Sequence, residues 1–453
     1  MKIKTLMLCT MFILSCGLAL AEEKLSYAPP SHLPHTQRQM KTAGFWISHH
    51  TNPDRVVMNL QGIARFNHHV QDELNLTKDI FAITRDFKTE SLAQDFDNTI
   101  DGFHNKGYYT AQGVRDDTQF IDKVKRNMNL TGIVLGVTPR YGLVTHFTYQ
   151  RLLPTGDPLY EQKDDIDFDQ IQNSGLDVGT PVAVVHVSAD KQWYYVISQI
   201  SDGWVAVKDI ALGDINTVKL FAAEENIAVV IKPKADIFLN EKMTDFYDMV
   251  RMGTHLPMAG VDEGRVSVNI PAVDKEGRLV LQEAFMNEAD VSVGYLPYTP
   301  RTIYNQAFAM LNQPYGWGDV EGEQDCSRFL QMVFATVGIV LPRNSKEQGQ
   351  SGVVLTEFTE RDGRESKMDA LAKVTGAITI LPMKGHIMLY LGLVDGTPYV
   401  IQETSGYRQP GVEKEITRSL NRVVVSDLSL GEGSSKNSLL KRINRLVEVN
   451  AGE

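Results

Sequence analysis

The stretch DCSRFLQMVFATV, residues 325–337, decides the fold of this chain. Its apolar residues recur at the spacing of one helix face, namely Phe329, Leu330, Val333, Phe334 and Val337. Gly338 stands where this helix should end, and Asp325 is a suitable N-cap. Cys326 therefore falls at the helix start, where unpaired backbone amides favour a negative charge. We predict a helix that presents Cys326 with a lowered thiol pKa and a reactive thiolate.

Cys326 is also the one cysteine that follows residue 16, because the other two are Cys9 and Cys16. Exported proteins normally use their cysteines in pairs, as disulfides. An unpaired thiol in such a protein is either an inert buried side chain or a reactive one. The helix start favours the reactive interpretation.

Short β-rich runs follow this helix, and one of them begins with Gly385 and His386. Alternation along that run puts His386 on the same face as Met388 and Tyr390. A helix followed by an antiparallel sheet is the α+β order of papain-like cysteine hydrolases, in which an imidazole pairs with the thiol. We therefore predict that His386 is the general base and acid for Cys326.

A third side chain should hold the imidazole in orientation, and the next strand offers Gln402 and Glu403 on opposite faces. A two-residue turn at Asp395 and Gly396 puts Glu403 on the face of His386. A three-residue loop puts Gln402 there instead. A slip of one residue reverses the answer, so alternation alone leaves both open.

The N-terminus predicts export. Lys2 and Lys4 precede the apolar residues 6–14, and Ala19-Leu20-Ala21 is a cleavage pattern of signal peptidase. Cleavage after Ala21 gives a signal peptide of residues 1–21. The alternative is a lipoprotein with a lipid anchor at Cys16. Either way we expect a protein of the periplasm or cell envelope.

Composition divides the remaining chain. Residues 22–125 are predicted to form a mainly helical domain, residues 126–232 a first SH3-like β-barrel and residues 233–298 a second. Residues 299–453 hold Cys326 and His386.

The bulk composition excludes several classes of partner. A net charge of −11 disfavours nucleic acid, which requires a basic surface. No stretch after the N-terminus is long and apolar enough to span a membrane. His49 with His50 and His68 with His69 are two adjacent pairs, and neighbours on a helix diverge, so each pair is a poor chelate. We predict no metal site and no cofactor.

Four ordered motifs identify the family that residues 304–407 resemble. They are YGWG at residues 315–318, DCS at 325–327, LPRNSKEQ at 341–348 and GHIMLYLG at 385–392. These resemble the motifs of NlpC/P60 cysteine peptidases, and the preceding segments resemble the subgroup in which bacterial SH3 domains precede the peptidase. The resemblance implies an α+β, papain-like catalytic domain behind two SH3-like β-barrels and an N-terminal mainly helical segment.

The resemblance also implies an activity on peptidoglycan stem peptides (muropeptides), with hydrolysis of the bond between γ-D-glutamate and diaminopimelate or lysine. By motif position, Cys326 is the nucleophile, His386 the base, and Gln402 stands where the family usually has histidine. A glutamine amide can still accept the imidazole N–H.

Further residues follow from the same resemblance. It implies that the first SH3-like barrel walls off one end of the cleft with an aromatic residue, for which Tyr194, Tyr195 and Trp204 are the candidates. Asp325, Ser327 and Ser345 would bind a free N-terminal L-alanine, and Trp317 would be a further substrate-binding residue. Arg328 replaces the usual glycine, and would pair with a substrate carboxylate or with Asp325.

Two rival functions fit the same sequence. One is a non-catalytic peptidoglycan-binding scaffold with a degenerate peptidase domain, which the Gln402 departure favours. The other is an acyltransferase or amidase of the same fold acting on another γ-linked or lipid substrate.

Overall fold

The protein is described here from a computed structural model that covers residues 26–27, 33–83, 89–115, 117–133, 138–163 and 165–452. The predicted signal peptide and the possible lipid anchor at Cys16 lie outside these residues. Among the described residues, no helix has both the length and the apolar character that a bilayer crossing needs.

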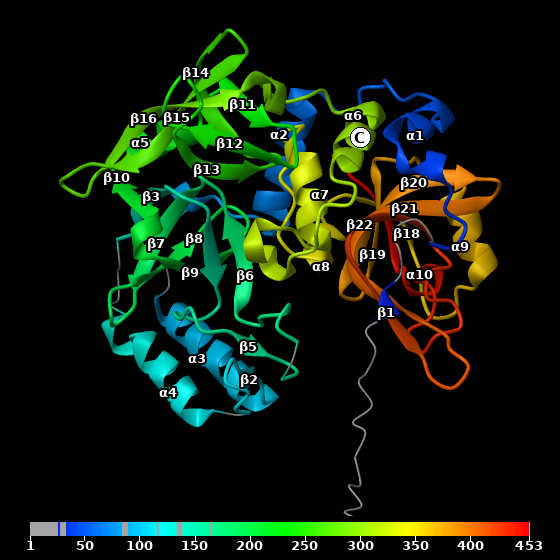
Figure 1. Ribbon diagram of the computed structural model, residues 1–453, viewed down its shortest axis with the longest axis horizontal. Coiled ribbons are helices and arrows are strands. Elements are labelled where there is room, and N and C mark those ends of the chain that lie inside the picture. The colour runs from blue at the N-terminus through cyan, green and yellow to red at the C-terminus, as the bar shows by residue number, and fades with distance from the viewer. Residues whose placement is uncertain are drawn as a thin grey trace, which may run out of the picture.

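Two β-rich units occupy the middle of the chain (Figure 1). Unit 1 is a seven-stranded sheet in the order β10 (Ile210–Gly213), β3 (Arg140–Val144), β7 (Pro181–Val187), β8 (Trp193–Ile197), β9 (Asp202–Ala206), β4 (Thr148–Arg151), β6 (Gln172–Leu176). Unit 2 is a second one in the order β13 (Phe246–Arg251), β12 (Lys234–Phe238), β16 (Leu279–Asn287), β15 (Arg265–Val273), β14 (His255–Asp262), β11 (Ile227–Val230), β17 (Val291–Val293). Unit 2 thus begins earlier than residue 233, because β11 pairs with β14 and β17.

The C-terminal domain contains the third seven-stranded sheet. Its order is β1 (Ser26–Tyr27), β22 (Ile416–Asp427), β21 (Thr397–Gln409), β20 (His386–Val394), β19 (Thr379–Met383), β23 (Arg445–Glu448), β18 (Val353–Glu357). Its helices are α6 (Pro300–Ala309), α7 (Cys326–Ala335), α8 (Ser345–Gln348), α9 (Arg364–Leu371) and α10 (Leu439–Arg442). Helix α6 begins with residues that favour a helix N-terminus, because Thr299 is the N-cap and Pro300 lies in the first turn. The α+β architecture with helix α7 ahead of an antiparallel sheet is confirmed.

The N-terminal region is helical, as predicted, but its helices do not form one domain. They are α1 (Ala43–His49), α2 (Leu60–His68), α3 (Thr89–Lys106) and α4 (Thr118–Asn127). Trp46 of α1 and Phe66 of α2 lie in the core of the C-terminal domain, whereas Phe96 of α3 packs against Trp204 in the core of unit 1. The prediction of a single domain over residues 22–125 is therefore wrong, because each helix pair buries its apolar face on a different sheet.

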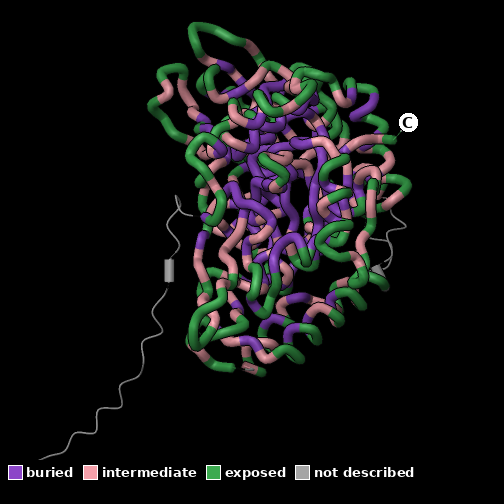
Figure 2. The backbone as a smooth tube through the Cα atoms, turned by 90° about the vertical axis from the view of Figure 1, so that its right-hand side faces the viewer, coloured by how far each residue is buried: buried purple, intermediate pink, exposed green. Residues whose placement is uncertain are grey.

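The cores explain why the units hold together. One hydrophobic core runs through units 1 and 2, with Val218 and Phe221 of α5 (Ile215–Ala222) packed within it. A second core joins α1, α2, α6 and α7 to one face of the C-terminal sheet. In Figure 2 the buried residues form a continuous interior through the molecule. Helix α7 lies in this interior, so its position is set by packing from several sides.

Candidate active site

Cys326 is the first residue of α7, and Asp325 is the N-cap of that helix. The Asp325 carboxylate accepts the backbone N–H groups of Ser327 and Arg328 at 3.1 and 2.9 Å. Phe329 follows on the buried face and is completely covered. The cap and the apolar face together hold the thiol at the start of a rigid helix.

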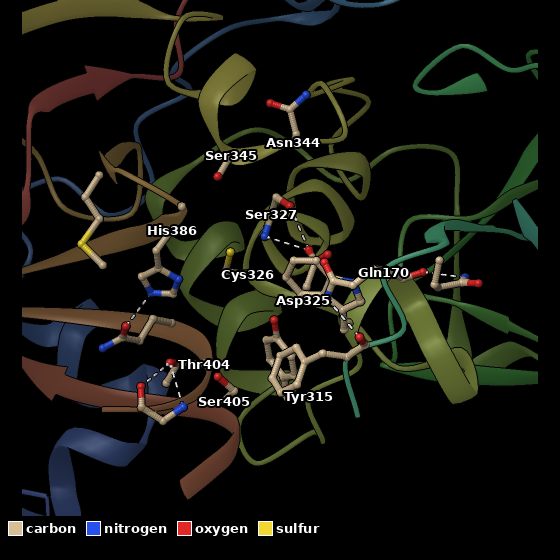
Figure 3. A pocket seen from close by; sticks show the side chains of 18 of the residues that line it. Gln170, Tyr315, Asp325, Cys326, Ser327, Asn344, Ser345, His386, Thr404 and Ser405 are labelled. Atoms are coloured by element: carbon tan, nitrogen blue, oxygen red, sulfur yellow. Dashed lines mark hydrogen bonds between the residues drawn. The ribbon is translucent and has the colours of Figure 1, made fainter. Parts of the chain in front are cut away.

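His386 is the first residue of β20 and lies beside Cys326 (Figure 3). Gly385 precedes it with φ of 73°, a left-handed conformation that glycine adopts without strain. The turn pairs Met383 with His386, and the backbone N–H of Ile387 donates to the Cys326 sulfur. The strand start therefore contacts the helix start directly.

Gln402 is the side chain that contacts the imidazole. The His386 Nε2 atom lies 2.8 Å from the Gln402 Oε1 atom, and Gln402 Nε2 donates to Ser426 Oγ at 2.7 Å. The second bond fixes the amide so that its oxygen faces the ring. With Nε2 held in this way, Nδ1 is the nitrogen left for the thiol.

A β-bulge decides between Gln402 and Glu403. The turn at residues 395–396 has two residues, with Val394 opposite Thr397, which without a bulge would put Glu403 on the His386 face. The register shifts between Tyr390 and Gly392, so that Leu389 pairs with Ile401. This one-residue shift brings Gln402 onto the His386 face.

Glu403 points the other way, into the protein. It is fully buried, and one carboxyl oxygen accepts from Gln324 Nε2 at 2.9 Å while the other has no partner among the described residues. Burial raises the pKa of Glu403 well above its usual value, and the Asp325 charge adds to this. Glu403 is therefore a buried acid with a raised pKa that faces away from His386 and does not orient it.

A cleft of about 750 Å³ opens over Cys326 and His386, and its wall contains most of the predicted substrate-binding residues. They are Trp317, Asp325, Ser327 and Ser345. Arg328 is the exception, because its guanidinium points into the protein and bonds to Asp177 Oδ2 of unit 1 at 2.9 Å. Neither predicted partner of Arg328, a substrate carboxylate or Asp325, is the one observed.

Comparison with family models assigns two parts of the chain. The model of the NlpC/P60 family matches residues 312–425, and that of the SH3 domain of SH3b1 type matches residues 158–206. The chain carries an NlpC/P60 domain. The family implies a cysteine peptidase and is consistent with a cell-wall endopeptidase. A comparison with curated protein sequences gave no match.

One solved structure has the same fold over nearly the whole chain. An NlpC/P60 endopeptidase from Photobacterium damselae subsp. piscicida superposes with a TM-score of 0.76 at 20% identity, covering 94% of this chain and 99% of the other. An NlpC/P60 family protein from Bacillus cereus gives a TM-score of 0.41 at 18% identity, with 61% and 82% of the two chains covered. At these identities the first superposition establishes the fold of nearly the whole chain, and nothing rests on the second.

The electrostatics of the NlpC/P60 domain differ from the sequence prediction. Burial raises the pKa of the Cys326 thiol to about 12, with a contribution from the Asp325 charge, although the N–H of Ile387 opposes it. Burial also lowers the pKa of His386 to about 4. The predicted lowering of the thiol pKa is therefore wrong, because desolvation of the half-buried Cys326 sulfur outweighs the helix N-terminus. Thiol and imidazole are both neutral near pH 7.

A buried ionic network anchors the N-cap of α7. Arg343 bonds to Asp325 at 2.9 Å and to Asp319 at 3.1 Å, and Asp319 is fully buried. Asp319 also pairs with Arg251 of unit 2 at 3.2 Å and accepts the backbone N–H of Gly175 in unit 1 at 2.8 Å. Arginine side chains hold the pKa of Asp319 at about 2 in spite of burial. The network thus ties both β units to the residue before the nucleophile.

The aromatic residue that unit 1 contributes to the cleft is Phe168, which sequence reasoning missed. Its ring lies 5.6 Å from that of Trp317 and 6.1 Å from that of Tyr315. The three candidates named from the sequence are elsewhere. Trp204 is fully buried, Tyr195 packs on it at 5.4 Å, and Tyr194 lies under Arg140. Phe168 stands in an acidic loop between strands, where no periodicity marks a wall residue.

Two further elements line the cleft although no motif pointed to them. Helix α3 contributes Phe103 and Lys106 to the wall. The C-terminal segment contributes Lys436 and Arg442, which lie beyond the residues that match the NlpC/P60 family.

Tyr315 lies below Cys326 in Figure 3, and burial raises the pKa of its phenol, so that it stays protonated. It can donate a hydrogen bond within the cleft.

Proposed function

We propose that this chain is a cysteine endopeptidase that hydrolyses the γ-D-glutamyl bond to the diamino acid of peptidoglycan stem peptides. The observation that carries the proposal is the alignment of Cys326, His386 and Gln402 on the floor of a cleft. A nucleophile, a base and a group that orients the base are the parts that acyl transfer requires. The substrate places the mature protein in the cell envelope.

The reaction begins with neutral groups. As the Cys326 sulfur attacks the γ-glutamyl carbonyl, its proton passes to Nδ1 of His386, and Gln402 stabilises the imidazolium through Nε2. The start of α7 and the Tyr315 hydroxyl provide donors for the oxyanion. His386 then protonates the leaving amine, and water hydrolyses the thioester that remains on Cys326.

The acyl side of the cleft has a free acceptor for an amino group. Asp325 Oδ1 already accepts bonds from Ser327, Arg328 and Arg343, whereas Oδ2 accepts one, from Arg343 Nη2 at 2.9 Å. The open lone pair of Oδ2 suits the ammonium group of an N-terminal L-alanine. Phe168 of unit 1 packs edge-on against Trp317 in the wall of the same cleft, and a chain extended beyond the L-alanine would have to pass this wall.

Hydrolysis is therefore expected to depend on a free N-terminus. Acetylation of L-Ala-γ-D-Glu-diaminopimelate should lower kcat/KM by about 100-fold, because it removes the charge that Asp325 Oδ2 accepts and adds bulk against unit 1. Mass spectrometry of the digests gives both the bond cut and the rate. Intact sacculi cut as fast as the free tripeptide would contradict the proposed end requirement.

The acid limb of the pH profile is expected near pH 4. His386 must be unprotonated to accept the thiol proton, and its pKa is lowered from 6.5 to about 4, so kcat/KM should stay constant as the pH falls through 6.5. It should decline only as His386 becomes protonated below about pH 5. Measurements of kcat/KM between about pH 3.5 and pH 8, with circular dichroism to confirm folding, test this. A limb near the ordinary histidine pKa would show that the imidazole is solvated in the free enzyme.

A further inference from the structure

The charge of the cleft is opposite to that of the protein. The chain has a net charge of −11, but the cationic residues that line the cleft are Lys106, Arg343, Arg408, Lys436 and Arg442. Among the described lining residues Asp325 is the one carboxylate, and it is paired with Arg343. The remaining cations thus face the cleft without a compensating acid in its wall.

Arg442 lies on the His386 side of the cleft. Met383 pairs with His386 in the sheet, and an isolated bridge joins Met383 to Ile443, the residue after Arg442. The positive charge of Arg442 contributes to the lowered pKa of His386, which is consistent with this proximity. Asp325 lies on the other side of Cys326 from His386 (Figure 3). Since His386 protonates the leaving amine, Arg442 stands where the leaving group must lie.

Arg442 is itself an exposed residue, and its guanidinium has no carboxylate within ion-pair distance among the described residues. Partial desolvation by the surrounding protein lowers its pKa. Of the acids of the neighbouring segment, Glu432 pairs with Arg364, whereas Glu415 binds Ser435 and lies near enough to Arg408 for the two charges to interact. Neither acid forms an ion pair with Arg442. A partly desolvated arginine without an anion is a ready site for one. Lys436 and Arg408 are exposed and extend the positive charge outward along the same wall.

We propose that Arg442, with Lys436 and Arg408, forms a carboxylate-binding subsite for the leaving diamino acid. This inference rests on the proposed function. Diaminopimelate differs from lysine by a carboxylate at its far end, and an arginine at this position would pair with that group. The subsite therefore selects diaminopimelate with a free distal carboxylate over lysine and over the amidated form.

The test compares kcat/KM for three peptides that share L-Ala-γ-D-Glu and end in diaminopimelate, in diaminopimelate with an amidated distal carboxylate, or in lysine. The wild-type enzyme is expected to prefer the first by about 10- to 100-fold, the range of a hydrogen bond to a charged group. In Arg442→Gln, which keeps most of the side-chain length, this preference should fall towards one. Arg364→Gln is the matched control, because Arg364 is an exposed arginine of α9 that does not line the cleft. Circular dichroism confirms that each variant is folded.

The outcomes separate the two proposals. A wild-type enzyme that cuts none of the three peptides overturns the proposed function and this inference with it. A wild-type enzyme that cuts all three at equal kcat/KM leaves the endopeptidase function standing and overturns the subsite. An Arg442→Gln variant that keeps the wild-type preference, or a matching loss of preference in Arg364→Gln, also overturns it.

Discussion

Replacing Cys326 by alanine is expected to lower kcat/KM for L-Ala-γ-D-Glu-diaminopimelate by about 10⁴-fold or more. The sulfur forms the acyl bond, and no other cysteine occurs after residue 16 to replace it. His386→Ala should cause a loss of similar size, because the thiol pKa of about 12 leaves almost no thiolate near pH 7 without a base. Losses in residues that act as a unit are not additive, so the double variant should be no worse than either.

Both variants are expected to remain folded, which makes the result interpretable. The Asp325 cap uses the backbone amides of Ser327 and Arg328 and does not involve the Cys326 sulfur. His69→Ala is the matched control, because His69 is an exposed histidine paired with Glu73. Turnover that survives in either active-site variant would refute the mechanism. A wild-type protein that binds muropeptides without cutting them would favour the scaffold function instead.

Replacing Asp319 by asparagine is expected to lower the free energy of unfolding by about 3–5 kcal/mol, the cost of breaking a buried ion pair on one side. Asp319 is fully buried, and Arg251, Arg328 and Arg343 surround it at 3.2, 3.5 and 3.1 Å. Asparagine keeps the shape and tolerates the left-handed φ of 71°, so the change removes mainly the charge.

Urea unfolding followed by circular dichroism measures this loss. Asp54→Asn is the control, because Asp54 forms an exposed ion pair with Arg301, and exposed pairs contribute little. Asp319→Asn should also lower kcat/KM. Arg343 pairs with both Asp319 and Asp325, and the loss of the Asp319 charge would leave Arg343 less firmly held beside Asp325. Equal stability of the two variants would contradict the structural importance of the network.

The local parts of the site could be predicted from the sequence. Asp325 as a cap, the apolar spacing of α7 and the Gly385 turn before His386 depend on interactions within a few residues. The turn at Asp395 and Gly396 was also predictable, for the same reason. The motifs around these residues were sufficient to identify the NlpC/P60 family and the α+β fold.

The orienting residue could not be derived from alternation. The register that puts Gln402 on the face of His386 depends on a bulge at Leu391, and the bulge relates two strands. No local sequence pattern indicates the bulge, and a register shift of one residue decides whether Gln402 or Glu403 faces His386. Motif position indicated Gln402, but only the paired strands show that contact.

The pKa of the Cys326 thiol could not be predicted from the sequence either. The sequence places Cys326 at a helix start and so predicts a lowered pKa, but burial by the surrounding units raises it. Desolvation depends on every element packed around a group, which local sequence does not specify. The sequence by itself therefore determined the helix that begins at Cys326 and the strand that begins at His386, because short-range capping and periodicity encode them. Only the tertiary structure decided the register at Gln402, the Phe168 wall and the cationic wall around Arg442, because each brings together segments far apart in the chain.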